Sequence, residues 1–225
     1  MIEKLRQAFP ELKLELDRPY RELTTLGVGG TLPVLAEPAS GDELKKLLAF
    51  LSGNRIPFFI LGGGSNLVGM DAPYEGVAVR LDKTAFGKIE RDGSLLRTGA
   101  AAKLPALANY AAENGLHGFA PLACIPGNVG GALRMNASCR GTAIGELVET
   151  LYGVRFDGTP WQAEAKELKW SYREGGAPAD VVITGATFAL EPGDPAAEKA
   201  VMKAAEILGD TADAAALIPE ALKYL

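Results

Sequence analysis

The sequence predicts an α+β fold, and three observations carry that prediction. Strand-like and helix-like segments alternate through the first half of the chain. A hairpin signal, Asp157-Gly158-Thr159-Pro160, then separates two strand-like runs in the second half. At 225 residues the chain can bury the core of one large domain or of two small lobes. Alternation followed by hairpins favours α+β over a simple doubly wound sheet.

The first elements follow from their boundary residues. Residues 33–37 form a short expected strand. Ser40 is a suitable N-cap for a helix that carries acidic residues in its first turn, where the helix dipole favours them. One face of this helix has leucines at helical spacing: Leu44, Leu47, Leu48 and Leu51. The apolar run 57–61 predicts a strand that leads directly into a glycine-rich loop.

The remaining elements alternate in the same way. An alanine-rich helix is expected over residues 103–114, with Gly115 at its C-terminal end. Residues 196–225 are expected to be helical, with breaks near Gly209 and Pro219. Further strands are expected over residues 77–81, 95–98, 147–156, 161–165 and 181–190.

Composition and charge exclude several classes of function. A net charge of -5 and the lack of a basic patch argue against nucleic-acid binding. The charged N-terminus lacks the apolar run of a signal peptide, and no stretch is apolar enough to span a bilayer. We therefore expect a cytoplasmic protein that does not bind membranes. The lone His117 and two widely spaced cysteines make no ligand cluster, so no metal site is expected.

Two glycine-rich loops are the strongest functional signal. The first, Leu61-Gly62-Gly63-Gly64-Ser65-Asn66-Leu67, follows the expected strand 57–61. Its exposed N–H groups can form an anion-binding concavity, and Ser65 and Asn66 add side-chain donors. A tight turn that needs positive φ is the structural alternative. Three glycines followed by Ser-Asn exceed what a turn requires, so the sequence favours a ligand site.

The second loop is Ile125-Pro126-Gly127-Asn128-Val129-Gly130-Gly131-Ala132, continuing to Met135-Asn136-Ala137. Its glycines precede an apparent helix start, and a helix N-terminus that a ligand can approach closely suits a pyrophosphate. Close helix packing is the alternative. The spacing is not that of a Rossmann fingerprint, and no Walker loop is present. Two such loops in one small chain suggest a dinucleotide held from both sides.

Three further groups of residues could have either a functional or a structural role. Ser171-Tyr172-Arg173 could place a cation beside a cofactor, or it could be a surface pair with Trp170 packed beneath it. His117 has no obvious nucleophile near it in sequence, which argues against a catalytic role. The two cysteines, Cys124 and Cys139, suggest buried small hydrophobes rather than a disulfide framework, with a reactive thiol near a ligand as the alternative.

Several ordered motifs together resemble the UDP-N-acetylenolpyruvoylglucosamine reductase family, also called UDP-N-acetylmuramate dehydrogenase, which makes a peptidoglycan precursor. The resemblance covers roughly residues 23–203. It is carried by Thr24-Thr25-Leu26-Gly27-Val28-Gly29-Gly30, by both glycine loops, by Ser171-Tyr172-Arg173, and by Phe188-Ala189-Leu190-Glu191-Pro192-Gly193-Asp194.

The resemblance implies a two-lobed FAD-binding domain of the vanillyl-alcohol oxidase (PCMH-like) type. By this likeness residues 23–81 form the first lobe and residues 82–194 the second. Residues 1–22 are expected to be an N-terminal helical segment. Residues 195–225 are expected to be a helical tail in place of the family's substrate domain.

The resemblance also implies the site residues. Arg173, with Tyr172 beside it, matches the family arginine near the flavin and the substrate carboxylate. FAD is the implied cofactor, NADPH the electron donor, and a small molecule, a UDP-sugar, the substrate. The implied FAD contacts are Leu61, Gly62, Gly63, Gly64, Ser65, Asn66, Leu67, Ala100, Ile125, Pro126, Gly127, Val129, Gly130, Gly131, Ala132, Asn136, Ala137 and Ile183.

The sequence also departs from the family pattern. The family's C-terminal Ser-Ala-Gly-Ser-x-Phe stretch, whose second serine donates a proton, has no counterpart here, nor does its later catalytic glutamate. Cys124 stands where the family usually has Gly, and Asn128 where Thr is common. Three hypotheses follow. The chain is a flavin oxidoreductase of altered or incomplete activity, which acts on a different substrate or whose open flavin face is covered by a partner chain or a homo-oligomer. It is a non-catalytic flavin-binding or regulatory module. Or its loops hold another nucleotide, or nothing.

Overall fold

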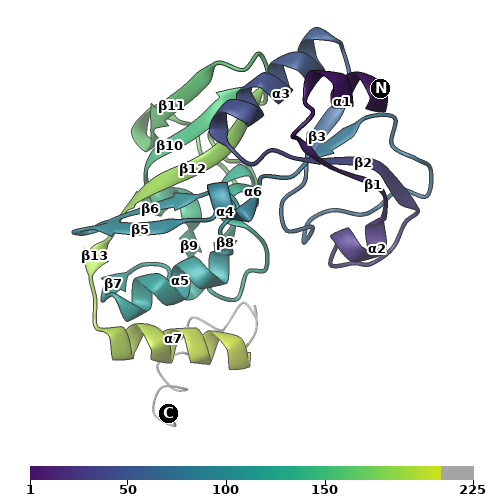
Figure 1. Ribbon diagram of the computed structural model, residues 1–225. Helices are drawn as coiled ribbons and strands as arrows, with labels where there is room; N and C mark the ends of the chain where they lie inside the picture. Colours follow the sequence, from purple (N-terminus) through teal and green to yellow (C-terminus); the bar gives the residue numbers. More distant parts are fainter. Residues whose placement is uncertain (209–225) are drawn as a thin grey trace.

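The computed structural model describes residues 1–208, with side chains through residue 204. Two sheets dominate it, one on each side of the molecule in Figure 1. The first has the order β1-β2-β4-β3, in which β1 and β2 are antiparallel while β4 is parallel to both β2 and β3. Its strands are β1 (Lys13–Pro19), β2 (Thr31–Glu37), β3 (Phe58–Ile60) and β4 (Val77–Val79).

The second sheet is antiparallel throughout and has the order β11-β10-β12-β6-β5. Its strands are β5 (Ile89–Asp92), β6 (Leu95–Gly99), β10 (Val148–Arg155), β11 (Pro160–Glu164) and β12 (Val181–Ala189). Two short pairs complete the described strands: β7 (Leu116–His117) with β13 (Glu191–Pro192), and β8 (Ser138–Cys139) with β9 (Thr142–Ala143).

Helices connect the strands of the two sheets. The described α-helices are α1 (Ile2–Ala8), α2 (Tyr20–Leu23), α3 (Gly41–Gly53), α4 (Lys83–Phe86), α5 (Leu104–Glu113), α6 (Val129–Arg134) and α7 (Pro195–Leu208). Short 3-10 helices span Ala120–Leu122, Ile144–Leu147 and Ala165–Glu167. Among these helices, none is long and apolar enough to cross a membrane.

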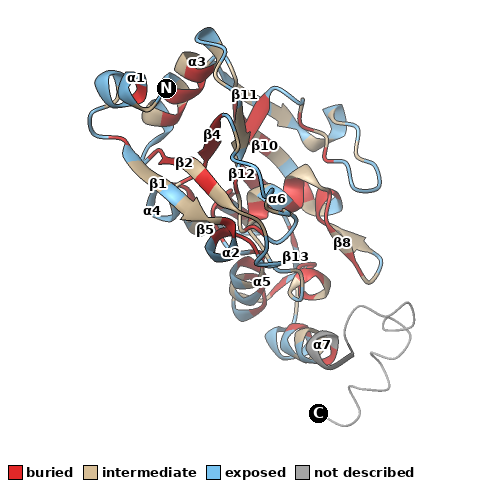
Figure 2. Cartoon of the chain, turned by 90° about the vertical axis from the view of Figure 1, so that its right-hand side faces the viewer, coloured by how far each residue is buried: buried red, intermediate tan, exposed pale blue. Residues whose placement is uncertain are grey.

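Helix α3 joins the two sheets. Ser40 caps it by accepting a hydrogen bond from the Glu43 N–H at 3.1 Å, and its four predicted leucines are all buried. At its far end the Ser52 hydroxyl donates to the Phe156 carbonyl at 2.7 Å, next to the β10–β11 turn. The rings of Phe58 and Phe156 pack edge to face at 4.7 Å. Figure 2 shows buried residues in both strands and helices, and one core cluster of buried residues continues through both sheets.

The expectation of a helical segment over residues 1–22 is wrong for Lys13–Pro19, which form strand β1. This strand pairs with β2, for example Leu16 opposite Val34, so the first sheet begins before residue 23. The run Lys-Leu-Glu-Leu alternates polar and apolar residues, which is a strand pattern with a period of two. Helix α7 ends the described chain, and residues 209–225 of the expected helical tail lie outside the described residues.

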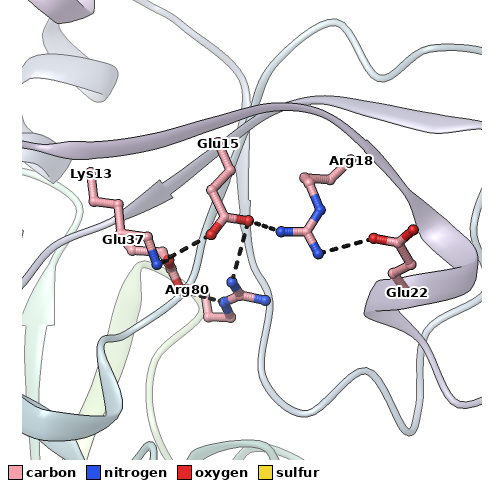
Figure 3. A network of polar contacts seen from close by, with 6 residues as sticks. All are labelled: Lys13, Glu15, Arg18, Glu22, Glu37 and Arg80. Atoms are coloured by element: carbon pink, nitrogen blue, oxygen red, sulfur yellow. Dashed lines mark hydrogen bonds and ion pairs between the residues drawn. The ribbon is translucent and has the colours of Figure 1, made fainter.

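A network of charged side chains holds β1 to the rest of the first sheet (Figure 3). Lys13 pairs with Glu37, and Arg80 Nε lies 2.6 Å from the second oxygen of that carboxylate. Burial by itself would raise the pKa of Glu37, but hydrogen bonds from Arg80 and Lys13 outweigh it and hold the pKa below its ordinary value. Glu15 pairs with Arg18, which also reaches Glu22 on α2 at 3.1 Å.

Candidate cofactor-binding site

A cleft runs between the two sheets and contains both glycine loops. Its main cavity has a volume of about 460 Å³ and is lined by residues 60–67, residues 125–128, part of α6, Met135, Ala137 and Arg173. A second cavity of about 130 Å³ adjoins it, because Ile60, Gly62 and Gly131 line both. The start of β12 and the segment after β6 form the far wall of this second cavity.

The first loop leaves the edge of the sheet immediately after β3. Leu61 is buried, and its N–H donates to the Val79 carbonyl at 2.9 Å, which fixes the point of departure. Beyond it, the N–H groups of residues 62–66 donate to no backbone carbonyl within the described part of the chain. Unpaired N–H groups along a cleft are donors that a ligand can use.

The glycines of the two loops differ in whether packing within the protein requires them. A Cβ on Gly64, which has φ of +72°, would collide with the Leu23 carbonyl oxygen, and one on Gly130 would lie 2.8 Å from the Ala100 Cβ. These two glycines are needed for packing. A Cβ on Gly62 or Gly131 would meet nothing within 4 Å. No packing within the described chain requires these two glycines, and both line the cleft.

The two loops touch each other at the end of the cleft. Ser65 Oγ donates a hydrogen bond to the Pro126 carbonyl at 3.1 Å. A Cβ on Gly63 would lie 3.0 Å from the Gly127 Cα, so the two backbones are in close contact. Gly127 has φ of +118°, a conformation that an L side chain rarely adopts. The loops, although far apart in sequence, therefore form one wall.

Helix α6 offers fewer free donors than the sequence suggested. The N–H groups of Val129 and Gly130 donate to the Ala102 and Ala100 carbonyls, each at 2.9 Å. These two hydrogen bonds anchor the helix to the segment after β6. The first loop therefore has more unpaired backbone N–H groups than the start of α6 has. Asn128 caps the helix by position only, and its Oδ1 is buried without a hydrogen-bond partner among the described residues. Asn128 lines both cavities.

Arg134 is a cation in the cleft wall that the sequence reasoning missed. It lines both cavities, and its guanidinium donates to the carbonyls of Ala177 at 2.8 Å, Pro178 at 3.1 Å and Val181. Burial lowers its pKa. No carboxylate within the described residues forms an ion pair with it. The guanidinium is thus fixed by neutral carbonyls, and its charge is available to a ligand.

Arg173 lies at a tight turn on the main cavity. Ser171 and Glu174 exchange backbone hydrogen bonds of 3.1 and 3.2 Å, which leaves Tyr172 and Arg173 at the corner. Arg173 has φ of +59°, a conformation that side-chain-bearing residues seldom adopt and that is common at functional sites. Its guanidinium carbon lies 5.2 Å from the centre of the Tyr172 ring. Tyr172 itself is 82% exposed and does not line the cavity.

Asn136 stabilises this turn through a side-chain hydrogen bond. Its Nδ2 donates to the Ser171 carbonyl at 3.0 Å, and its Oδ1 accepts from the Gly145 N–H at 3.1 Å. Both groups of the amide are therefore used inside the protein, and Asn136 lines neither cavity. Its contribution to the site is to position the corner that carries Arg173.

Most of the expected site residues meet in this cleft. Three do not line it: Val129 and Asn136, which are buried beneath it, and Tyr172, which is exposed beside it. Ala100, Gly130 and Ile183 line the second cavity, and the rest of the expected set lines the main one. Cavity residues absent from the expected set are Ile60, Leu81, Ala101, Asn128, Arg134, Met135, Val181 and Val182.

The lone histidine lies outside the cleft lining. His117 Nδ1 is 2.5 Å from an oxygen of Glu198, so it connects β7 to α7. Within the described residues, no group of three or more His, Cys, Asp or Glu side chains could hold a metal ion.

Comparisons with known proteins agree with this geometry. The FAD binding domain family model matches residues 32–159. A UDP-N-acetylenolpyruvoylglucosamine reductase of Methylorubrum extorquens is 39% identical over 90% of this chain and 66% of its own length. The reductase of a Bradyrhizobium species is 33% identical over 92% of this chain and 68% of its own length. The chain thus spans about two thirds of the length of these relatives.

Solved structures give the same assignment. The Thermus caldophilus reductase superposes with a TM-score of 0.74 at 28% identity, covering 88% of this chain and 69% of that one. A cholesterol oxidase from Brevibacterium sterolicum has a TM-score of 0.59 at 14% identity over 81% of this chain and 38% of that one, which shows a shared fold only. The fold is therefore the α+β, two-lobed FAD-binding type of the vanillyl-alcohol oxidase flavoproteins, and the chain belongs to the UDP-N-acetylenolpyruvoylglucosamine reductase family.

Proposed function

We propose that the cleft binds FAD across its two glycine loops and that the chain is a flavin-dependent oxidoreductase. One observation carries the proposal. Among the described residues, those that line the two cavities include two arginines, Arg134 and Arg173, and no aspartate or glutamate, although the chain as a whole has a net charge of -5. A cleft with only positive charges in a negatively charged protein favours an anionic ligand.

The chemistry of the lining fits FAD in three respects. The unpaired N–H groups of residues 62–66 and the Arg134 guanidinium suit the two negative charges of its diphosphate. Asn128 lines both cavities, and its side-chain amide suits the hydroxyl and N–H groups of the cofactor. The open surfaces at Gly62 and Gly131 leave room for close approach.

The protein's own residues would bind and orient the reactants. Bound FAD would supply hydride transfer between an electron donor and an acceptor. Arg173, at the corner of its turn on the main cavity, would bind an anionic group of the acceptor and stabilise the negative charge that grows there during reduction. Tyr172 would hold the guanidinium by stacking against it.

We propose an enolpyruvyl UDP-sugar as the acceptor, because the relatives are named reductases of that substrate. We propose NADPH as the donor, as the resemblance of the sequence motifs implies. This chain spans about two thirds of the length of these relatives. We propose that a partner chain or a second copy of the chain covers the opening of the main cavity beside the exposed Tyr172. Size-exclusion chromatography with and without ligands tests this part of the proposal.

An anaerobic titration separates an enzyme from a flavin-binding module without turnover. We expect the purified protein to take up FAD, to be bleached by NADPH, and to be reoxidised by the enolpyruvyl UDP-sugar. FAD uptake without reduction by NADPH would favour a non-catalytic or regulatory flavin module. A protein that takes up no FAD from an excess of the free cofactor would contradict both flavin proposals.

A further inference from the structure

The chain's two cysteines lie together directly behind the cleft wall. Cys124 follows the 3-10 turn Ala120–Leu122, and Cys139 is in β8. Their sulfur atoms are 3.4 Å apart, beyond the roughly 2.05 Å of a disulfide bond, so this structure holds them as two thiols in contact. The next residue after Cys124, Ile125, lines the main cavity, as does Ala137 two residues before Cys139.

A cation is held against both sulfurs. Arg140 and Gly141 connect β8 to β9 with φ of +50° and +79°, the positive values that a two-residue type I′ hairpin turn requires. This turn folds the Arg140 side chain back over the pair. Its Nη1 lies 3.3 Å from Cys124 Sγ and 3.5 Å from Cys139 Sγ. The thiolate is the attacking species in thiol–disulfide exchange, and reactive cysteines are commonly found beside cationic side chains.

The two thiols differ in access to solvent. Cys124 is exposed, which corrects the expectation that both cysteines are buried, whereas Cys139 is 4% exposed. A small molecule can therefore reach the Cys124 sulfur directly, and the Cys139 sulfur is reached through it. This is the arrangement of an attacking thiol with a resolving thiol behind it.

We propose that Cys124 and Cys139 form a thiol–disulfide exchange site for low-molecular-weight disulfides of the glutathione class. The Cys124 thiolate attacks such a disulfide, forms a mixed disulfide and releases one small thiolate. The Cys139 thiolate then attacks the Cys124 sulfur, forms the Cys124–Cys139 bond and releases the second small thiolate. The protein loses two electrons and two protons, and the small disulfide gains both. The inference does not depend on the proposed function of the cleft.

The test is thiol trapping on the whole chain. Wild type, Cys124→Ser, Cys139→Ser and Cys139→Ala are incubated with glutathione disulfide, quenched with an alkylating agent in denaturant, and weighed as intact proteins. We expect wild type to lose both alkylatable thiols without retaining glutathione, and to regain them in dithiothreitol. We expect each Cys139 variant to retain one glutathione on Cys124, and Cys124→Ser to retain none.

Specific outcomes would overturn the proposal. Wild type that keeps both thiols, or that accumulates the same stable glutathione adduct as Cys139→Ala, would show that the pair does not close. Glutathione retained by Cys124→Ser would show that Cys124 is not the attacking thiol. Agreement between the Cys139→Ser and Cys139→Ala adducts, with unchanged far-UV circular dichroism, excludes unfolding as the cause of the reactivity.

Discussion

Ser65 Oγ donates a hydrogen bond to the Pro126 carbonyl at 3.1 Å, and this bond joins two loops that are 61 residues apart in sequence. Next to it, Gly63 and Gly127 are in backbone contact. The first loop follows β3, whereas the second lies between the 3-10 helix Ala120–Leu122 and α6. Their contact therefore fixes the width of this end of the cleft. The geometry of the candidate site therefore depends on a contact between the loops as well as on the loops themselves.

Removing the Ser65 hydroxyl should loosen this contact. We expect Ser65→Ala to weaken FAD binding by about three- to ten-fold, since an intramolecular hydrogen bond contributes about 1 kcal/mol. Flavin fluorescence quenching measures the affinity. Ser94→Ala is the matched control, because Ser94 is exposed and far along the chain from both loops. Equal FAD affinities for the two variants would show that the Ser65–Pro126 hydrogen bond does not contribute to FAD binding.

Arg134 gives a prediction that separates charge pairing from packing. If its guanidinium faces the diphosphate, Arg134→Gln should weaken FAD binding by roughly ten-fold or more while leaving riboflavin, which lacks phosphates, almost unaffected. Arg134→Lys should retain part of the FAD affinity. The affinities for both flavins are measured side by side. Equal losses for FAD and riboflavin would indicate that the bonds to Ala177, Pro178 and Val181 matter only for the fold.

Arg173 is expected to act on the acceptor rather than on the cofactor. Arg173→Ala should leave FAD affinity within about two-fold and slow reoxidation of the reduced protein by the acceptor about a hundred-fold, as for the loss of one charge-stabilising group. Stopped-flow absorbance measures the rate. Arg173→Gly controls for relief of the φ of +59°. Reoxidation at the wild-type rate in Arg173→Ala would exclude Arg173 from the acceptor site.

The charged network around β1 predicts a dependence of stability on acid. The pKa of Glu37 is lowered in the folded protein, so its stabilising contribution is present above the unfolded pKa, about 4.3, and is lost as pH falls through the folded pKa. Glu37→Gln should lower the free energy of unfolding at pH 7 by about 2 kcal/mol. Below about pH 5, the free energy of unfolding of this variant should decrease less steeply with falling pH than that of wild type.

Urea unfolding at several pH values tests this prediction. Glu90→Gln, at an exposed position of β5, is the control and should change neither the stability at pH 7 nor the acid slope. An acid slope in Glu37→Gln that equals that of wild type would mean that other carboxylates account for it.

The sequence anticipated those parts of the molecule that local chemistry determines. Helix α3 could be predicted because Ser40 caps it and its leucines repeat at helical spacing. Strand β1 was missed because its short alternation becomes decisive only through pairing with β2. Val129 and Asn136 were expected in the site because they belong to the glycine-loop motif, but the side-chain direction depends on packing. Arg134 was missed because nothing local shows that its helix turns it toward the cleft.

A binding titration of two aspartate variants tests most directly whether the open glycine surface of the cleft receives FAD. A Cβ at Gly131 or at Gly41 would meet nothing within 4 Å, so both substitutions should leave the fold intact. Gly131 lines the cleft and Gly41 begins α3 outside its lining. We predict that Gly131→Asp loses FAD affinity at least ten-fold while Gly41→Asp binds like wild type. Unchanged FAD affinity in folded Gly131→Asp would contradict the account.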